Sequence, residues 1–126
     1  MKKVIVTGGA GFIGSNLVKK LLDLNVEKLL IIDDLSTGNE SNISSIVNDE
    51  RVQFLNSKIE DIESLNELFK DYDFCYHLAA GVGVQYIMDN LSESLLTNIF
   101  ATHKVLEACQ VNELPILLTS TSEVYG

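Results

Sequence analysis

Short apolar runs alternate with longer amphipathic stretches along the whole chain. The runs are Val4–Val6, Leu29–Ile32, Val52–Leu55, Phe74–Leu78 and Ile116–Thr119. Runs of this length, bounded by turn-forming residues, are typical of strands that are buried on both faces. Because helical patterns separate them and the connections are short, the sequence predicts an α/β protein, a Rossmann-like doubly wound parallel sheet. The expected strand order is 3-2-1-4-5, with helices on both faces in three αβα layers.

The helices between these strands are predicted from apolar residues three or four positions apart. The expected buried sets are Ile13, Leu17, Leu21 and Leu22 in the first helix, Ile62, Leu65, Leu68 and Phe69 in the second, and Leu95, Ile99, Leu106 and Cys109 in the third. The third helix is the longest and is expected over residues 92–108. A further short helix is expected over residues 41–48.

A glycine-rich turn follows the first strand, with Gly8, Gly11 and Gly14 spaced three residues apart. We expect Gly8 to turn the backbone out of the strand, Gly11 to admit a ligand, and Gly14 to let the helix pack closely. The unpaired N–H groups of the helix start then favour an anion, typically a pyrophosphate. Glycine also serves ordinary turns, so the turn alone leaves a purely structural role open.

Two acids end the second strand and make the ligand more specific. Asp33 and Asp34 lie about 20 residues beyond the turn, where dinucleotide-binding folds carry the acid that accepts from the adenosine ribose. Residues 33–42 contain no Lys or Arg, whereas an NADP site needs a basic group for the 2′-phosphate. The sequence therefore predicts NAD. A solvated loop is the alternative, and Gly38 and Asn39 are expected to supply its positive φ.

Composition and charge limit the classes of protein to which this chain can belong. The 126 residues, 46% of them hydrophobic, suit one domain over residues 1–126. No apolar run approaches membrane-spanning length, so we expect a cytoplasmic protein without a membrane partner. The net charge of -9 disfavours nucleic acid as a partner. Cys75 and Cys109 lie in apolar patterns and are expected to be buried thiols, and with His77 and His103 they lack zinc-ligand spacing.

Two further stretches fall at the expected ligand edge of the sheet. Small residues over Ala79–Gly83 follow the fourth strand, and they allow backbone to approach a bound dinucleotide or simply to pack tightly. Asn98 is the polar exception near the apolar face of the third helix. It either supports the site or satisfies a neighbouring loop, as an inward Asn commonly does.

Five motifs together resemble the extended short-chain dehydrogenase/reductase family, the NAD-dependent nucleotide-sugar epimerases and dehydratases. The motifs are Thr7–Gly14, Asp33–Gly38, His77–Ala80, Thr97–Asn98 and Ser120–Gly126. The resemblance covers essentially the whole chain. The ending Ser-Thr-Ser-Glu-Val-Tyr-Gly is most similar to UDP-glucuronate decarboxylases and some 4-epimerases, and less similar to dTDP-glucose 4,6-dehydratases.

The resemblance implies NAD as cofactor, a nucleotide sugar as substrate, and a role for each matching residue. The implied cofactor contacts are Gly8, Gly11, Phe12, Ile13 and Gly14 at the pyrophosphate, Asp33, Asp34 and Thr37 at the adenosine ribose and nearby phosphate, Ile59 at the adenine, Leu78, Ala79 and Ala80 at the nicotinamide ribose, and Asn98 at the floor of the site. Thr121 matches the catalytic Ser/Thr that hydrogen-bonds the sugar 4-hydroxyl, with Ser122 and Glu123 beside the ring.

The chain departs from the family pattern at three places. Lys58 stands where many members have an Asp that contacts the adenine amino group, and Ala101 replaces a glycine. The third departure is larger, because the family's base is the Tyr of a Tyr-x-x-x-Lys pair. Tyr72, Tyr76 and Tyr86 have no Lys four residues on, and the chain stops one residue after Tyr125.

Two interpretations follow from that missing pair. In the first, the chain is the amino-terminal half of an enzyme that oxidises the sugar at C4 and then epimerises, decarboxylates or dehydrates it. In the second, it is a catalytically silent NAD-binding module, or a fragment that needs a partner chain. In both, the fifth strand is expected to be an uncovered edge through which the chain could associate, and the family is often dimeric.

Overall fold

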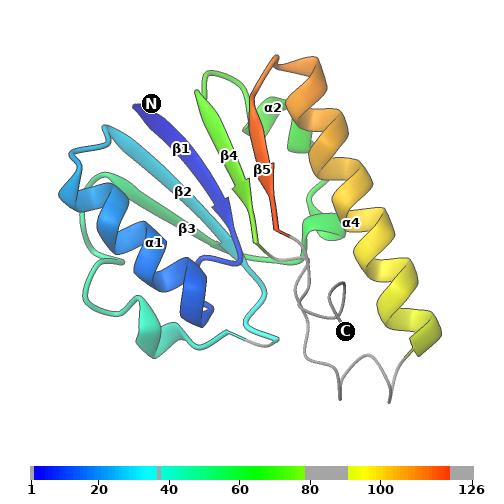
Figure 1. The fold of residues 1–126 in the computed structure, drawn as a ribbon, viewed down its shortest axis with the longest axis horizontal. Helices are drawn as coiled ribbons and strands as arrows, with labels where there is room; N and C mark the ends of the chain where they lie inside the picture. The colour runs from blue at the N-terminus through cyan, green and yellow to red at the C-terminus, as the bar shows by residue number, and fades with distance from the viewer. Residues whose placement is uncertain (1, 37, 79–90, 120–126) are drawn as a thin grey trace.

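The computed structural model describes residues 2–36, 38–78 and 91–119, with only the backbone of residues 91–98. The elements are β1 (Lys3–Thr7), α1 (Phe12–Asp23), β2 (Lys28–Asp33), η1 (Glu40–Asn42), β3 (Val52–Asn56), η2 (Ile59–Asp61), α2 (Leu65–Leu68), β4 (Phe74–His77), α4 (Leu91–Val111) and β5 (Ile116–Leu118). They alternate between strand and helix along the chain, as predicted (Figure 1).

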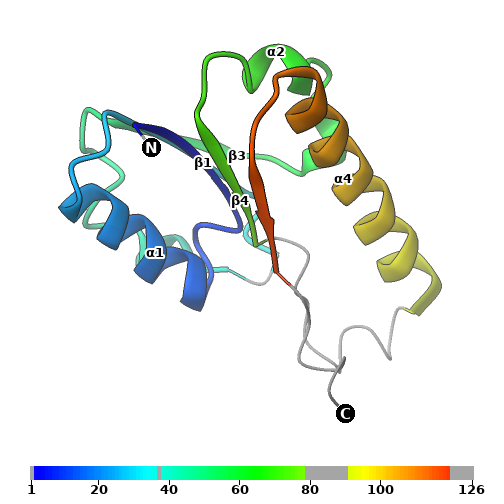
Figure 2. The ribbon, with the colours of Figure 1, turned by 45° about the horizontal axis from the view of Figure 1, so that its top comes forward.

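The five strands form one parallel sheet in the order β3-β2-β1-β4-β5. All four pairings are parallel. Figure 2 shows α1 on one side of this sheet and α4 on the other. The doubly wound sheet and the order 3-2-1-4-5 are therefore confirmed. Because the strands are parallel, their carboxyl ends meet at one edge, which is where ligands bind in such folds.

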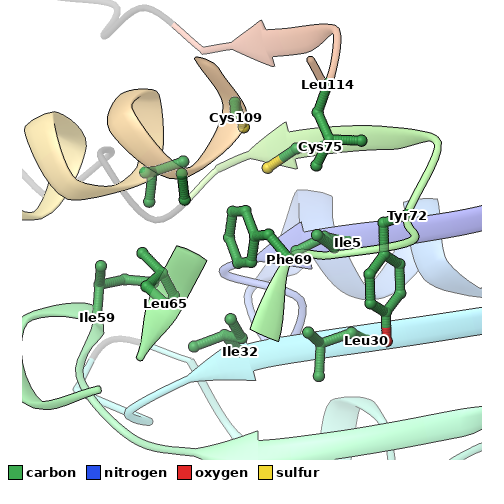
Figure 3. Packing of buried hydrophobic residues seen from close by; sticks show 12 residues of the cluster. Ile5, Leu30, Ile32, Ile59, Leu65, Phe69, Tyr72, Cys75, Cys109 and Leu114 are labelled. Carbon is green, nitrogen blue, oxygen red and sulfur yellow. The ribbon is translucent and has the colours of Figure 1, made fainter. Parts of the chain in front are cut away.

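Alternation along the strands divides the core into two clusters. Val4, Val6, Leu29 and Ile31 face α1, where Val18, Leu21 and Leu22 cover them; we call this the α1-side cluster. The intervening residues face the other way, toward η2, α2 and α4. This α4-side cluster contains Ile5, Leu30, Ile32, Ile59, Leu65, Phe69, Tyr72, Cys75, Val105, Ala108, Cys109 and Leu114 (Figure 3).

Two predicted helix faces are wrong in part. Ile13 is 69% exposed at the start of α1, whereas Leu21 and Leu22 are buried as expected. In α4, Ile99 and Leu106 are exposed, whereas Cys109 is buried as predicted, and Val105 and Ala108 pack beside it in the core. Apolar residues occur around most of this helix, so periodicity could not choose the face, and small or β-branched side chains pack against the sheet. The side chain of Leu95 lies outside the described residues.

Two predicted helices are shorter than expected. Residues 41–48 form only the end of the 3-10 turn η1 and then a series of turns. The segment after β3 is split into η2 and the four-residue α2, although Leu65 and Phe69 are buried as predicted. α4 is longer than predicted and continues to Val111.

The cysteines and the edge strand agree with their predictions. Cys75 and Cys109 are both buried free thiols whose side chains contact one another in the α4-side cluster (Figure 3). This contact and burial raise the pKa of the Cys75 thiol. Among the described strands β5 pairs with β4 alone, and its Leu117 and Leu118 are exposed.

Candidate functional site

The glycine-rich turn connects β1 to α1 at the carboxyl edge of the sheet. Gly8 has a φ of 77°, a conformation that favours glycine, and its N–H donates to the Ile32 carbonyl at 2.7 Å. A Cβ on Gly14 would overlap the Gly8 carbonyl oxygen and lie 2.9 Å from Gly9 Cα. The predicted turning role of Gly8 and packing role of Gly14 are confirmed.

Gly11 differs from these two glycines. A Cβ on Gly11 would meet nothing closer than the Gly8 carbonyl oxygen at 3.4 Å, which is ordinary contact. Gly11 has a φ of -76°, which any residue can adopt. The fold itself therefore does not require glycine here. This is consistent with the predicted close approach of a ligand, which stays a prediction.

The start of α1 presents unpaired N–H groups. Gly11 is the N-cap and offers no side-chain acceptor, and the first helical bond runs from Ser15 N–H to the Gly11 carbonyl at 2.8 Å. In the described part of the chain, no acceptor meets the N–H groups of Phe12, Ile13 and Gly14. The first turn of α1 also carries no acidic residue. Three free donors and the positive end of the helix dipole make this a favourable position for an anion.

Asp33 lies at the mouth of this turn. Its Oδ2 accepts a hydrogen bond from the Ala10 N–H at 2.9 Å, and its Oδ1 accepts from the Leu35 N–H at 2.8 Å. Each carboxylate oxygen can accept more than one bond, so capacity remains for a ligand hydroxyl. Asp34 is more exposed, and its Oδ1 accepts locally from the Ser36 N–H at 3.0 Å. The acid on β2 and the turn after β1 are thus brought together.

The loop after Asp33 folds back onto the turn in a way that the sequence did not indicate. Leu35 adopts a φ of 63°, whereas Gly38 and Asn39, which were predicted to supply positive φ, do not; Asn39 is extended at -140°. The bend at Leu35 is closed by the hydrogen bond from its N–H to the Asp33 carboxylate. Gly38 is needed for space, because a Cβ would lie 3.0 Å from Ala10 and from Asp33 Oδ2.

Sequence reasoning missed Ala10 and Asn42 as members of this region. The Ala10 carbonyl accepts from the Asn39 N–H at 3.1 Å and from the Asn42 Nδ2 at 2.8 Å. Ala10 is an apolar residue inside the turn, and Asn42 lies 32 positions away. No local pattern could have paired them, although an Asn in a loop shortly after the strand acid was an available signal.

A buried histidine joins the ends of β1 and β4 to α4. His77 Nδ1 lies 2.6 Å from Thr7 Oγ1, and its Nε2 lies 3.2 Å from Thr102 Oγ1. Burial lowers the pKa of His77 from 6.5 to about 4. A neutral imidazole can donate through one nitrogen and accept through the other, and each hydroxyl can play either role. His77 is therefore a neutral connection beneath the site.

The other predicted site residues are only partly described. The Leu78 N–H donates to the Thr7 carbonyl at 3.0 Å, which holds the end of β4 beside the turn. Ile59 is buried in the α4-side cluster, and Lys104 Nζ secures the adjoining backbone by donating to the Ile62 carbonyl at 2.7 Å. Outside the described residues lie Thr37, Ala79, Ala80, Thr121, Ser122, Glu123 and the side chain of Asn98.

Within the described ranges no helix is long and apolar enough to cross a membrane. The same residues contain no group of three or more His, Cys, Asp and Glu that could hold a metal ion.

Comparison with known proteins finds relatives whose names describe enzymes of nucleotide-sugar metabolism. Residues 5–126 match the family model described as GDP-mannose 4,6 dehydratase. The chain is 34% identical over 124 residues to UDP-glucuronic acid decarboxylase 6 of Arabidopsis thaliana, covering 98% of this chain and 35% of that protein. It is 33% identical to the UDP-N-acetyl-alpha-D-glucosaminuronate decarboxylase of Bacillus cytotoxicus, covering 99% and 38%.

Solved structures agree with this placement. The UDP-N-acetylglucosamine 4-epimerase from Methanobrevibacter ruminantium M1, in complex with UDP-N-acetylmuramic acid, superposes with a TM-score of 0.89 and 37% identity, covering 99% of this chain and 39% of that one. The DesIV double mutant of Streptomyces venezuelae, a dTDP-glucose 4,6-dehydratase with NAD and DAU bound, gives 0.88 and 30%, covering 98% and 41%. The chain spans little more than a third of the length of these relatives, and it belongs to their family of NAD-dependent nucleotide-sugar epimerases, dehydratases and decarboxylases.

Proposed function

We propose that this chain binds NAD at the turn between β1 and α1, and that it forms the cofactor-binding half of an enzyme acting on a nucleotide sugar. The observation that carries the proposal is the 2.9 Å hydrogen bond between the Ala10 N–H and Asp33 Oδ2. It holds an acid suited to a ribose beside three helix N–H groups that meet no acceptor among the described residues. Anion donors and an acid in this arrangement suit a dinucleotide.

In this proposal, different residues of the site contact different parts of the cofactor. The N–H groups of Phe12, Ile13 and Gly14 bind the diphosphate, and the absence of a side chain on Gly11 leaves room for it. Asp33, with Asp34 and Thr37, accepts from the adenosine ribose hydroxyls. A 2′-phosphate would meet the Asp33 carboxylate with no Lys or Arg among residues 33–42 to neutralise it, so NAD is preferred to NADP. Ile59 flanks the adenine, Leu78, Ala79 and Ala80 line the nicotinamide ribose side, and Asn98 supports the floor of the site.

The reaction proposed for the whole enzyme begins at sugar C4. NAD+ supplies a hydride acceptor when it is bound. Thr121 hydrogen-bonds the 4-hydroxyl, and Ser122 and Glu123 contact the sugar. The base is the Tyr of a Tyr-x-x-x-Lys pair, which the 126 residues do not include. The alternative function, for these 126 residues on their own, is a catalytically silent NAD-binding module.

Calorimetry on the purified chain tests the cofactor proposal. NAD+ should bind, and NADP+ should bind more weakly. Asp33→Asn should raise the Kd for NAD+ about tenfold or more, because a hydrogen bond to a charged acceptor contributes about 1.5–3 kcal/mol. No binding of NAD+, or equal binding of NADP+, contradicts the proposal.

Asp73→Asn is the matched control for this variant. Asp73 Oδ2 also accepts from two backbone amides, Lys2 N–H and Lys3 N–H at 2.9 Å, but at the amino end of β1, away from the site. It should keep the wild-type Kd. Turnover of UDP-, dTDP- or GDP-sugars by the chain alone would exclude the silent-module function. A longer form that carries the Tyr-x-x-x-Lys pair and turns over none of them would exclude the enzyme function.

A further inference from the structure

Asp33 at the end of β2 and the described residues of the following loop hold the glycine-rich turn at Ala10. The Ala10 N–H donates to Asp33 Oδ2 at 2.9 Å. The Ala10 carbonyl accepts from the Asn39 N–H at 3.1 Å and from Asn42 Nδ2 at 2.8 Å. A carbonyl oxygen has two lone pairs, so this one is fully used. Ala10 is completely buried; its N–H is held by the last residue of β2, and its carbonyl is held by the loop that follows β2.

The orientation of Ala10 sets the orientation of the helix start. The peptide that carries the Ala10 carbonyl also carries the Gly11 N–H, which donates to the Gly8 carbonyl at 3.2 Å. The next peptides carry the unpaired N–H groups of α1. The N-cap is glycine and makes no side-chain hydrogen bond, so backbone contacts of the turn, those of Ala10 among them, hold the start of the helix.

Ala10 has three hydrogen-bond partners: the Asp33 carboxylate, the Asn39 backbone N–H and the Asn42 side chain. Asn42 is therefore the one side chain that binds Ala10 besides the acid. It lies in η1, and its amide reaches the Ala10 carbonyl across the loop that bends at Leu35. The backbone of Leu35 is held in a left-handed conformation that a bulky residue rarely adopts. Such a conformation persists only where its surroundings impose it. The Asn42 contact closes this loop at its far end.

We propose that Asn42 is a positioning residue of the dinucleotide site: through the Ala10 carbonyl it fixes the α1 donors and the Asp33 carboxylate in one geometry, so that a diphosphate and its ribose are bound together. This inference rests on the proposed NAD binding. In this proposal the side-chain amide of Asn42 couples the helix donors of α1 to the Asp33 carboxylate.

Calorimetry with Asn42→Ala and a matched control tests the proposal. Asn112 makes equivalent bonds far from the site, since its Nδ2 donates to the Asn66 carbonyl at 2.8 Å and to the Ala108 carbonyl at 2.9 Å. Asn42→Ala should raise the Kd for NAD+ about tenfold, whereas Asn112→Ala should change it less than about twofold. Equal Kd values for Asn42→Ala and wild type, or equal losses in both variants, overturn the proposal.

NMR spectroscopy measures changes at Asn42 and Ala10 directly, and a general loss of stability would not produce them. In the wild-type chain, titration with NAD+ should slow hydrogen exchange at the Asn42 side-chain amide and at the Ala10 N–H. In Asn42→Ala, the Ala10 carbonyl carbon should shift, and in Asn112→Ala it should not. An Asn42 amide that is indifferent to saturating NAD+ overturns the proposal even if Asn42→Ala does not fold. Absence of NAD+ binding by the wild type would instead refute the proposed function.

Discussion

The candidate site and the α4-side cluster are held together by different kinds of interaction. At the carboxyl ends of β1 and β2, the candidate site is held by hydrogen bonds to one buried residue, Ala10, while the neighbouring Phe12 side chain is 83% exposed. On the face of the sheet that α4 covers, the α4-side cluster is held by packing around Phe69, which is completely buried (Figure 3). The comparison teaches that ligand geometry and stability depend on separate sets of residues here, so mutations should separate them.

Phe69→Ala should have the largest effect on stability. Phe69 is fully buried in the α4-side cluster, and truncation of such a residue costs about 3–5 kcal/mol. Chemical denaturation should show this loss, while calorimetry on the remaining folded protein at low temperature should give the wild-type Kd for NAD+. If the Kd rises as much as in Asp33→Asn, the two regions are not independent.

Acidification should lower the free energy of unfolding because His77 is buried in its neutral form. Burial lowers the folded-state pKa of His77 to about 4 from 6.5, so the unfolded chain binds the proton more readily. The neutral histidine's contribution is complete above pH 6.5 and is lost as the pH falls from 6.5 to 4, by up to about 3 kcal/mol. Denaturation midpoints measured across this range should record the loss.

Two histidine variants sharpen that measurement. His77→Gln should flatten the pH dependence between 6.5 and 4, although its stability at neutral pH will be lower. His103→Gln, at an exposed position on α4, should keep the wild-type slope. The Arg51 side chain lowers the pKa of Asp49 to about 2, so this carboxylate titrates below the window. A wild-type slope in His77→Gln would show that another group is responsible.

Two glycine variants should show that stability and NAD+ binding depend on different residues of the turn. Gly14→Ala forces a Cβ against the Gly8 carbonyl, and overpacking of this kind costs about 1–3 kcal/mol. Gly11→Ala meets only ordinary contact, so stability should change by less than about 1 kcal/mol, while the Kd for NAD+ should rise about tenfold because the methyl group occupies the ligand's approach. Thermal denaturation and calorimetry measure the two effects. Unchanged NAD+ binding by Gly11→Ala contradicts the assigned approach.

Much of the fold was predictable because its signals are local. Each strand is a short apolar run between turn formers, and parallel α/β topology then leaves few possible orders. The glycine turn and Asp33 were also predictable, because their spacing reflects a strand, a turn and a helix in succession. The predicted faces of α1 and α4 failed at Ile13 and Ile99, since apolar residues there lie on more than one side of the helix.

The sequence by itself thus determined the order of elements, the position of the turn and the acid that faces it, all of which depend on residues that are neighbours in the chain or are one strand apart. Only the tertiary structure decided that Ala10 meets Asn42, that Leu35 rather than Asn39 takes the left-handed bend, and that Cys75 contacts Cys109. These contacts join residues far apart in the chain or depend on the space that packing leaves, so no local pattern records them.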